Sequence, residues 1–190
     1  MAKISVAYAM CGSFCTLSRA IDQMENLINA GFEIYPVMSE ITYSTDTKFG
    51  RCEEINRRVE KLCGKQIAHT ITAAEPIGPG NFIDIVVICP CTGNTLSKLA
   101  NGITDTAVTM AAKAQLRKNM PVVISLATND ALGATAKNIG TIYNTKNVYM
   151  VPISQDNPEK KPNSMVSDFS LLLPCINEAL KGRQYQPLFK

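Results

Sequence analysis

The chain has 190 residues, which is enough for one domain that buries a sizeable apolar core. Hydrophobic residues make up 46% of the chain and charged residues 18%, a balance that excludes an intrinsically disordered protein. The net charge of +3 is spread along the chain and forms no basic patch, so we expect no nucleic-acid partner. Apolar runs such as 85–88 are too short to cross a bilayer and the first residues lack a signal-peptide pattern, so we expect a cytoplasmic protein without a membrane partner.

Seven cysteines stand at positions 11, 15, 52, 63, 89, 91 and 175. Their odd number, in a chain that is neither small nor secreted in pattern, argues against a disulfide framework. His69 is the only histidine, and no second cysteine pair has the spacing of a zinc site. We therefore expect buried or cofactor-adjacent thiols and no metal site.

The first half of the chain alternates between strand-like and helix-like segments. The expected elements are, in chain order, a strand at 3–9, a helix around the apolar positions 17–28, a strand at 33–38, a helix around 55–62 and a short strand at 67–71. Gly31 and Gly64 stand where helix C-caps are expected. Segment 75–80 contains two prolines and two glycines, so it predicts a loop.

The second half opens with the clearest buried strand, 83–89, whose unbroken apolar run is typical of a parallel sheet covered on both faces. The expected elements after it are a helix at 94–118 with a break near 101–102, a strand at 121–126, a helix at 130–138, a strand at 147–153, a flexible loop or lid at 154–164 and a terminal helix at 165–181. No repeat or linker divides the chain, so we expect a single domain over residues 1–190. The alternation predicts an α/β fold with a doubly wound, Rossmann-like or flavodoxin-like parallel sheet in three layers.

Ligands of such sheets bind beyond the carboxyl ends of the strands, and four polar segments stand there. Gly12 and Ser13 open the first helix and suit a phosphate, although a tight turn with a serine N-cap explains them equally well. Ser39 follows the second strand and suits a phosphate oxygen or a turn cap. Segment 90–95 is more polar than a packing loop requires and suits a sugar-like chain or a ring edge. Asn129 offers a donor and an acceptor at the next strand end, or serves as an N-cap.

These four segments resemble the homo-oligomeric flavin-containing cysteine decarboxylases, a family of flavoproteins that also includes flavin prenyltransferases. The family's Gly-Ser loop is matched at 12–13, and its serine after the second strand at 39. Its motif Pro-x-Thr-x-Asn-Thr, followed by Lys-x-Ala-x-Gly-Ile-x-Asp, is matched by residues 90–105. Its Pro-Ala-Met-Asn segment is matched in part, by Ala127 and Asn129. The resemblance covers about residues 4–140.

The resemblance implies that the chain binds FMN. Its phosphate would be held by Gly12, Ser13 and Ser39, and Asn129 would contact the ring or the substrate. The ribityl chain and the ring edge would contact the third segment, at Pro90, Thr92, Gly93, Asn94 and Thr95. Relatives assemble as trimers or dodecamers with FMN where subunits meet, so a homo-oligomer is implied as well.

The catalytic histidine of the cysteine decarboxylases has no counterpart, because segment 75–81 contains none. We interpret His69 as a structural residue of the expected strand 67–71, and Cys175 as a packing residue of the terminal helix. Cysteine decarboxylation is therefore disfavoured, and a decarboxylase-type or prenyltransferase-type enzyme stays as an alternative.

Three segments are similar to one branch of the family, in which the flavoprotein is one of two different subunits of an oxidoreductase of spore-forming bacteria. They are 75–79, 89–95 and 127–130, and the likeness continues through 160–164. The branch implies oxidation of a cyclic dicarboxylate to an aromatic ring during sporulation. It also implies a second, different subunit as the partner, which carries a nicotinamide cofactor in one variant of the scheme. A non-catalytic FMN-binding protein is the other alternative.

Removing electrons and protons from a dicarboxylate ring calls for a base and for donors that bind carboxylates. Glu75 is the candidate base and Lys98 the candidate carboxylate ligand, although Lys98 could equally face solvent. Lys160, Lys161 and Asn163 in the expected lid are a second set of candidate substrate contacts, or an ordinary solvated loop.

Overall fold

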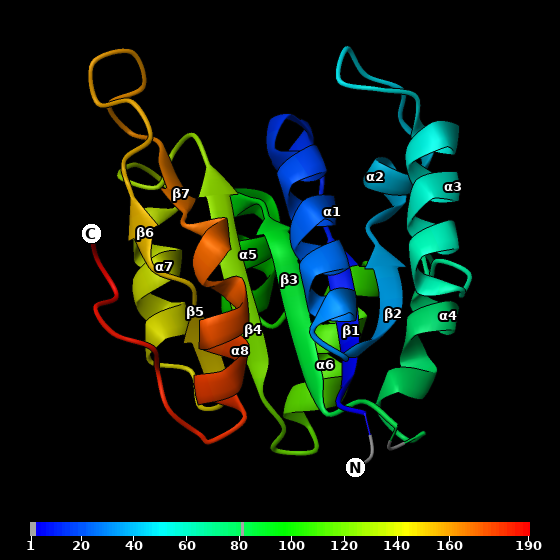
Figure 1. Cartoon of the computed structure of the whole chain (residues 1–190). Helices are drawn as coiled ribbons and strands as arrows, with labels where there is room; N and C mark the ends of the chain where they lie inside the picture. Colours follow the sequence, from blue (N-terminus) through cyan, green and yellow to red (C-terminus); the bar gives the residue numbers. More distant parts are fainter. Residues whose placement is uncertain (1–2, 81) are drawn as a thin grey trace.

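A twisted sheet runs through the middle of the computed structural model, which describes residues 3–80 and 82–190 (Figure 1). Its parallel part has the order β2-β1-β3-β4-β5. These strands are β1 (Ser5–Met10), β2 (Glu33–Met38), β3 (Ile85–Cys91), β4 (Val122–Thr128) and β5 (Val148–Met150). The predicted doubly wound α/β fold is therefore confirmed.

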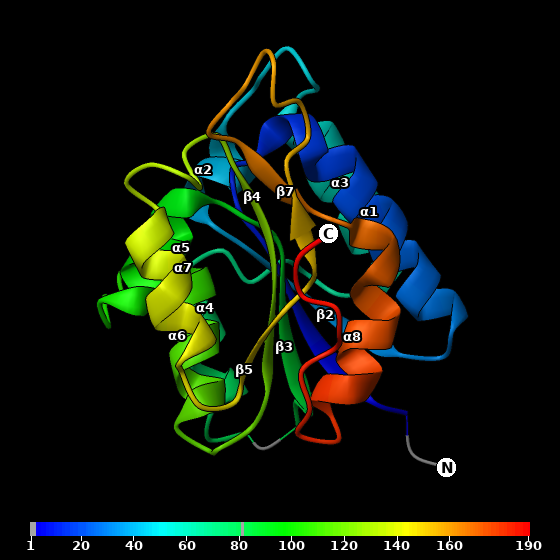
Figure 2. The same cartoon turned by 90° about the vertical axis from the view of Figure 1, so that its left-hand side faces the viewer.

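Helices cover both faces of the sheet (Figure 2). One face carries α1 (Phe14–Asn29), α3 (Cys52–Cys63) and α8 (Leu172–Ala179). The other carries α4 (Ile71–Ala74), α5 (Gly93–Ala100), α6 (Ala107–Leu116) and α7 (Ala136–Tyr143). The short α2 (Glu40–Ser44) follows β2. None of the described helices is long and apolar enough to span a bilayer.

Each face of the sheet has its own apolar cluster, because successive strand residues point to opposite sides. In β1, Ala7 and Ala9 pack with α5 and α6, whereas Val6 and Tyr8 pack with α1 and α8. All seven residues of β3 are buried, as the unbroken apolar run of this segment predicts. Each large apolar side chain removed from water in these clusters contributes about 1.5–3 kcal/mol.

Two segments in the first half and middle of the chain differ from the prediction. The expected strand at 67–71 is reduced to a single bridge between Ala68 and Val37. The predicted loop at 75–80 begins with a 3-10 turn, η1 (Glu75–Ile77). Asn81, which ends the segment without a histidine, lies outside the described residues.

The helix expected at 130–138 starts later, as α7 at Ala136. The Asp130 carboxylate accepts hydrogen bonds from the hydroxyls of Thr128 and Thr135 at 2.6 and 2.7 Å. These bonds close residues 128–135 into a turn, because the side chain of Asp130 satisfies groups on both sides of it.

The segment expected to be helical from 165 begins as a strand instead. Residues Met165–Ser167 form β7, which pairs antiparallel with the end of β4 and with β6 (Ile153–Ser154). The end of β4 extends beyond its pairing with β5, and β7 covers the backbone groups left there. A second 3-10 turn, η2 (Phe169–Leu171), follows, and helix α8 starts only at Leu172. Strand β7 thereby brings residues 164–168 to the carboxyl edge of the sheet.

Candidate functional site

A cavity of about 840 Å³ opens at the carboxyl edge of the sheet. Its walls come from the β1–α1 turn, the β3–α5 turn, the end of β4, strand β7, the 154–164 segment and the loop before α3. Pockets that bind small molecules span roughly 300–1,000 Å³, so this cavity has room for a mononucleotide. Six of the predicted residues line it, namely Gly12, Ser13, Thr92, Gly93, Asn129 and Lys161.

The β1–α1 turn offers free backbone amides to the cavity. No side chain caps the N-terminus of α1. Among the described residues, no backbone acceptor pairs with the amides of Gly12, Phe14 and Cys15. The Ser13 hydroxyl accepts a hydrogen bond from Thr16 at 2.9 Å instead of capping the helix. A helix N-terminus with unsatisfied amides favours an anion, because its N–H groups and its dipole both carry positive charge.

The β3–α5 turn packs so closely against the 128–135 turn that position 93 has to be glycine. A Cβ at Gly93 would lie 2.6 Å from the Thr128 hydroxyl, 2.8 Å from the Thr135 hydroxyl and 3.1 Å from a carboxylate oxygen of Asp130. The close approach places Thr92 on the same cavity wall as the exposed Asn129. The donor set here consists of backbone groups, hydroxyls and an amide, which suits a sugar chain and the polar edge of a ring.

Hydrogen bonding keeps the Asp130 carboxylate charged. The hydroxyl of Thr128, and after it that of Thr135, lowers the pKa of Asp130 from its ordinary value. The negative charge of Asp130 therefore stabilises the 128–135 turn, which carries the candidate ligand Asn129.

Strand β7 and the 154–164 segment form the wall opposite the β1–α1 turn. The Ser164 hydroxyl donates to the Thr128 carbonyl at 3.2 Å, which ties the segment to the end of β4. Lys161 forms an ion pair with Asp156 at 3.2 Å. The neighbouring Ser164 hydroxyl, and after it the Lys161 ammonium group, lower the pKa of Asp156. Lys160 and Asn163, the other candidates in this segment, are exposed and do not line the cavity.

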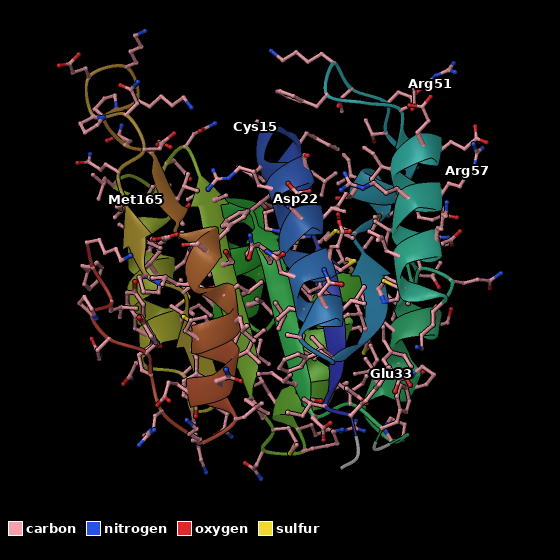
Figure 3. All side chains as sticks on the ribbon, viewed as in Figure 1. Cys15, Asp22, Glu33, Arg51, Arg57 and Met165 are labelled. Atoms are coloured by element: carbon pink, nitrogen blue, oxygen red, sulfur yellow. The ribbon has the colours of Figure 1, made fainter. Side chains whose placement is uncertain are left out.

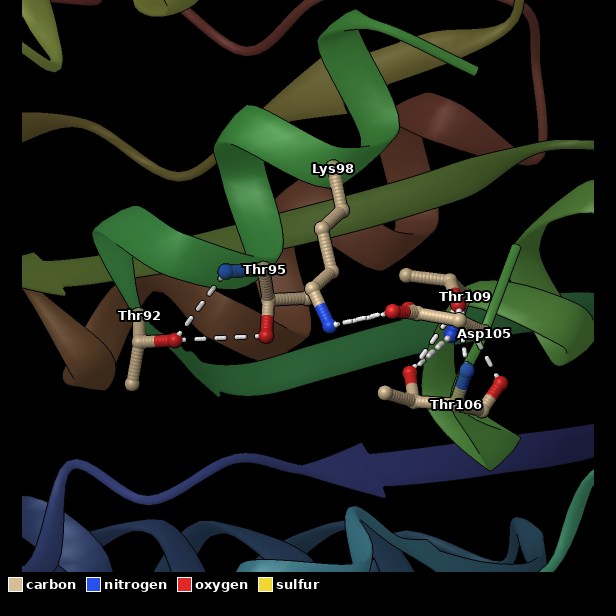
Figure 4. A network of polar contacts seen from close by, with 6 residues as sticks. All are labelled: Thr92, Thr95, Lys98, Asp105, Thr106 and Thr109. Carbon is tan, nitrogen blue, oxygen red and sulfur yellow. Dashed lines mark hydrogen bonds and ion pairs between the residues drawn. The ribbon is translucent and has the colours of Figure 1, made fainter. Parts of the chain in front are cut away.

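Four of the predicted FMN ligands lie at the same edge of the sheet but do not line the cavity. Ser39 is buried, and its hydroxyl pairs with that of Thr42 at 2.7 Å. Pro90 is buried in β3, and its carbonyl accepts from the Cys11 amide at 3.1 Å. Thr95 is buried behind Thr92, which accepts from its amide and donates to its hydroxyl, both at 3.2 Å (Figure 4). The remaining one, Asn94, is exposed on α5.

Lys98 has a structural partner in place of the predicted substrate. Its ammonium group lies 2.8 and 2.9 Å from the two carboxylate oxygens of Asp105, and the pair ties α5 to the segment before α6 (Figure 4). Gly102 between them has a φ of +69°, a left-handed conformation that glycine adopts without strain. The Lys-x-Ala-x-Gly-Ile-x-Asp motif is therefore explained by this connection, and Lys98 is not retained as a carboxylate ligand of the cavity.

Glu75 lies away from the cavity of its own chain. It is exposed in η1, and the carbonyl of Ile77 in the same turn accepts from Lys118 at 3.3 Å. Lys118 lies between α6 and the first residue of β4, so η1 is at the amino edge of the sheet. The prediction of Glu75 as a base has no support in this geometry.

The single histidine and the cysteines lie mostly in packed surroundings. His69 stacks on Tyr43 with ring centroids 3.7 Å apart. Burial raises the pKa of Cys175 to about 12. All seven cysteines are free thiols, and the exposed Cys15 lies at the cavity end of α1 (Figure 3).

Two basic residues of the cavity wall escaped the sequence analysis. Arg19 on α1 and Lys48 in the loop before α3 both line the cavity. The Arg19 guanidinium lies 5.0 Å from the ring centroid of Phe169. Neither residue belongs to a sequence motif. Their positions on the cavity wall follow from how α1 and the loop before α3 are arranged in the fold.

Comparisons with known proteins agree with the geometry. The model of the family described as Flavoprotein matches residues 1–177. The B subunit of dipicolinate synthase from Bacillus subtilis (strain 168) is 44% identical over 183 residues, which cover 96% of this chain and 92% of the relative. The crystal structure of the same B subunit from Bacillus halodurans has a TM-score of 0.91 and 42% identity, and the match covers 100% of this chain and 97% of that one. Burkholderia xenovorans DmrB in complex with FMN has the same fold, with a TM-score of 0.71 at 16% identity over 94% of this chain and 96% of that one.

Proposed function

The chain belongs to the Flavoprotein family, and from this premise we propose that it binds FMN as the B subunit of a dipicolinate synthase. The observation that carries the proposal is the convergence of Gly12, Ser13, Thr92, Gly93 and Asn129 on one cavity. The similarity to two such B subunits supports a companion protein, the A subunit of the same enzyme. The FMN complex of DmrB, described as a cubic protein cage, supports FMN as the flavin and a homo-oligomer as the assembly.

The donor groups of the cavity fit the parts of FMN. The free amides at the start of α1 would bind its phosphate, since they form the uncapped N-terminus of a long helix. Thr92 and the amide of Gly93 would contact the ribityl chain, and Asn129 would pair with the polar edge of the ring. The remaining space, toward β7 and Lys161, would receive the substrate.

The proposed reaction is the oxidation of a dihydrodipicolinate, or of its hydrated precursor, to aromatic dipicolinate during sporulation. Bound FMN would supply a hydride acceptor, and the protein supplies placement and charge. Wall residues from β7 and the 154–164 segment would orient the dicarboxylate and limit the access of water. The nicotinamide cofactor on the partner subunit stays a prediction.

A second candidate function is that of a flavin-holding protein whose base comes from the companion protein. The two carboxylates that line the cavity, Asp156 and Asp168, are both ion-paired with lysines. Their pKa values are lowered, that of Asp156 first by Ser164 and that of Asp168 first by Lys190, which makes both weak bases. With Glu75 at the other edge of the sheet, a base from the companion protein would complete the site.

The test of FMN binding uses a pair of variants that differ in one amide. Phe14 is the first residue of α1, a position that tolerates proline. Phe14→Pro and Phe14→Ala both remove the ring, and only Phe14→Pro removes the N–H. Because a hydrogen bond to a charged group contributes about 1.5–3 kcal/mol, we expect Phe14→Pro to bind FMN at least about tenfold more weakly than Phe14→Ala. Quenching of flavin fluorescence measures both dissociation constants.

Riboflavin, which lacks the phosphate, is the control ligand of this titration. It should bind the two Phe14 variants equally. A wild-type chain that binds no FMN contradicts the proposal, and so does one that binds FMN and riboflavin with equal affinity.

The redox role is tested by mixing the FMN-loaded chain with the dihydro substrate without oxygen. Bleaching of the flavin absorbance by the chain alone supports a catalytic role for this chain. Bleaching that requires the companion protein supports the flavin-holding candidate, and a flavin that stays oxidised in both mixtures contradicts both.

A further inference from the structure

Four basic side chains line the cavity, and they divide into two kinds. Two are neutralised by carboxylates of the same wall, Lys161 by Asp156 at 3.2 Å and Lys190 by Asp168 at 2.8 Å. For the other two, no carboxylate in the described part of the chain lies within ion-pair distance. These two are Arg19 and Lys48. The cavity therefore presents two positive charges without a protein counterion.

The guanidinium of Arg19 lies over an aromatic ring. Its guanidinium carbon lies 5.0 Å from the ring centroid of Phe169, and that ring is only 1% exposed. The ring packs in the apolar cluster with residues of α1 and α8, so it gives the exposed guanidinium a fixed surface to lie on. A cation–π contact of this kind leaves the guanidinium N–H groups that point away from the ring available for a carboxylate.

Lys48 approaches the cavity from a different element. It belongs to the loop between α2 and α3, and its ammonium group lies 5.2 Å from the ring centroid of Phe49. Arg19 belongs to α1, so the two cations are carried by separate walls of one cavity. A ligand with two anionic groups offers each cation its own partner, whereas a ligand with one such group does not.

We propose that Arg19 and Lys48 bind the two carboxylates of the substrate and thereby set the preference for a dicarboxylate. The inference rests on the proposed function and extends it to residues that select the substrate. The phosphate of the cofactor has its own donors in the free amides at the start of α1. Asp156 and Asp168 do not repel the substrate strongly, because Lys161 and Lys190 neutralise them.

The experiment compares two ligands on the FMN-loaded chain by isothermal titration calorimetry. Dipicolinate carries two carboxylates, and picolinate, pyridine-2-carboxylate, carries one on the same ring. A hydrogen-bonded charge contributes enough for about a tenfold change in affinity or more. We expect the wild-type chain to bind dipicolinate at least about tenfold more tightly than picolinate. In Arg19→Met and in Lys48→Met that ratio should fall close to one.

Matched variants separate this role from general effects of charge or of folding. Arg57→Met and Lys137→Met remove exposed basic residues outside the cavity, and both should keep the wild-type ratio. Arg19→Lys keeps the charge and loses the two-pronged geometry, so its ratio should lie between those of the wild-type chain and Arg19→Met.

Three results would overturn the inference: no binding of dipicolinate by the wild-type chain, an unchanged ratio in Arg19→Met and Lys48→Met, or weaker FMN binding in both variants with the ratio kept. The last result would assign the two cations to the phosphate. FMN affinity is measured in parallel on every variant, so the proposed function can stand while this inference fails.

Discussion

At the scale of single residues, the site depends on close backbone approach as much as on side-chain chemistry. Gly93 has no room for a methyl group, because the hydroxyls of Thr128 and Thr135 are fixed by Asp130. The family resemblance implies a cofactor contact at Gly93. In the structure, the absence of a side chain at Gly93 allows the turns that follow β3 and β4 to pack against each other at the cavity wall.

We predict that Gly93→Ala destabilises the fold by about 1–3 kcal/mol and weakens FMN binding, because overpacking forces the two turns apart. Gly140→Ala is the control, since no atom lies within 4 Å of the added Cβ in α7. That variant should gain about 0.5–1 kcal/mol from its higher helix propensity. Urea unfolding and flavin titration measure both effects, and equal stability of the two variants would refute the packing argument.

The charge of Asp130 predicts a pH dependence of stability. Its folded-state pKa is lowered, first by the hydroxyl of Thr128. The stabilisation is therefore complete above the unfolded-state value of about 3.9 and is lost as the pH falls through the folded-state pKa. Asp130→Asn keeps an acceptor oxygen and loses the charge. The difference in free energy of unfolding between wild type and Asp130→Asn should shrink as the pH is lowered from 6 toward about 3. A difference that is constant over this range would show that the charge is irrelevant.

At the scale of elements, the 154–164 segment connects the cavity to the end of the sheet. The amide of Gln155 donates to the Pro162 carbonyl at 2.8 Å, and the Leu132 amide donates to the Asn163 carbonyl at 3.2 Å. Most of its side chains are exposed, so few buried contacts hold it in place. We propose that this segment acts as a lid that closes when ligand fills the cavity.

This lid proposal predicts protection from trypsin. Cleavage after Lys160 should be several times slower in the presence of FMN and dipicolinate than in the free chain, because Lys161 and Ser164 would then contact an ordered ligand. Cleavage after Lys181, an exposed residue outside the cavity, is the internal control. Mass spectrometry of the fragments over time measures both rates, and equal slowing at the two sites, or none at Lys160, would argue against a lid.

Elements that are determined by the residues within them were predictable from the sequence, whereas elements that depend on distant contacts were not. Strand β3 was predictable because it is buried on both faces and its sequence is an unbroken apolar run. Helix α1 was predictable because it is buried on one face and its apolar residues recur at helical spacing. Strand β7 was missed because its pairing partner, the end of β4, lies far away in sequence. The helix predicted at 130–138 begins only at Ala136, because the side-chain hydrogen bonds of Asp130 to Thr128 and Thr135, which hold the residues before it in a turn, have no signal in the apolar spacing.

The candidate site was predictable in part for the same reason. Three of the four predicted strand-end segments line the cavity, because the topology of the sheet fixes where strand ends meet, whereas Ser39 of the remaining segment is buried beside it. The partners of single side chains were not predictable, and Lys98 is the example, since it pairs with Asp105 and does not line the cavity. Arg19 and Lys48 had no signal at all, because elements distant in sequence bring them to the wall.

At the scale of the whole molecule, the strand order places the cavity where connections from β1 and β3 leave in opposite directions. Strand β1 lies between β2 and β3; α1 connects β1 to β2 on one face of the sheet, whereas α5 and α6 connect β3 to β4 on the other. This reversal opens a crevice at the carboxyl edge, where α/β sheets bind their ligands. The β6–β7 pair then closes one side of the crevice.

A crystal structure of the chain grown with FMN would test directly where the cofactor binds. We predict density for FMN at the carboxyl edge of the sheet, with its phosphate on the amides of Gly12, Phe14 and Cys15 and its ring beside Asn129. FMN bound at any other place on the chain, or crystals in which the cavity excludes it at saturating concentration, would contradict the account.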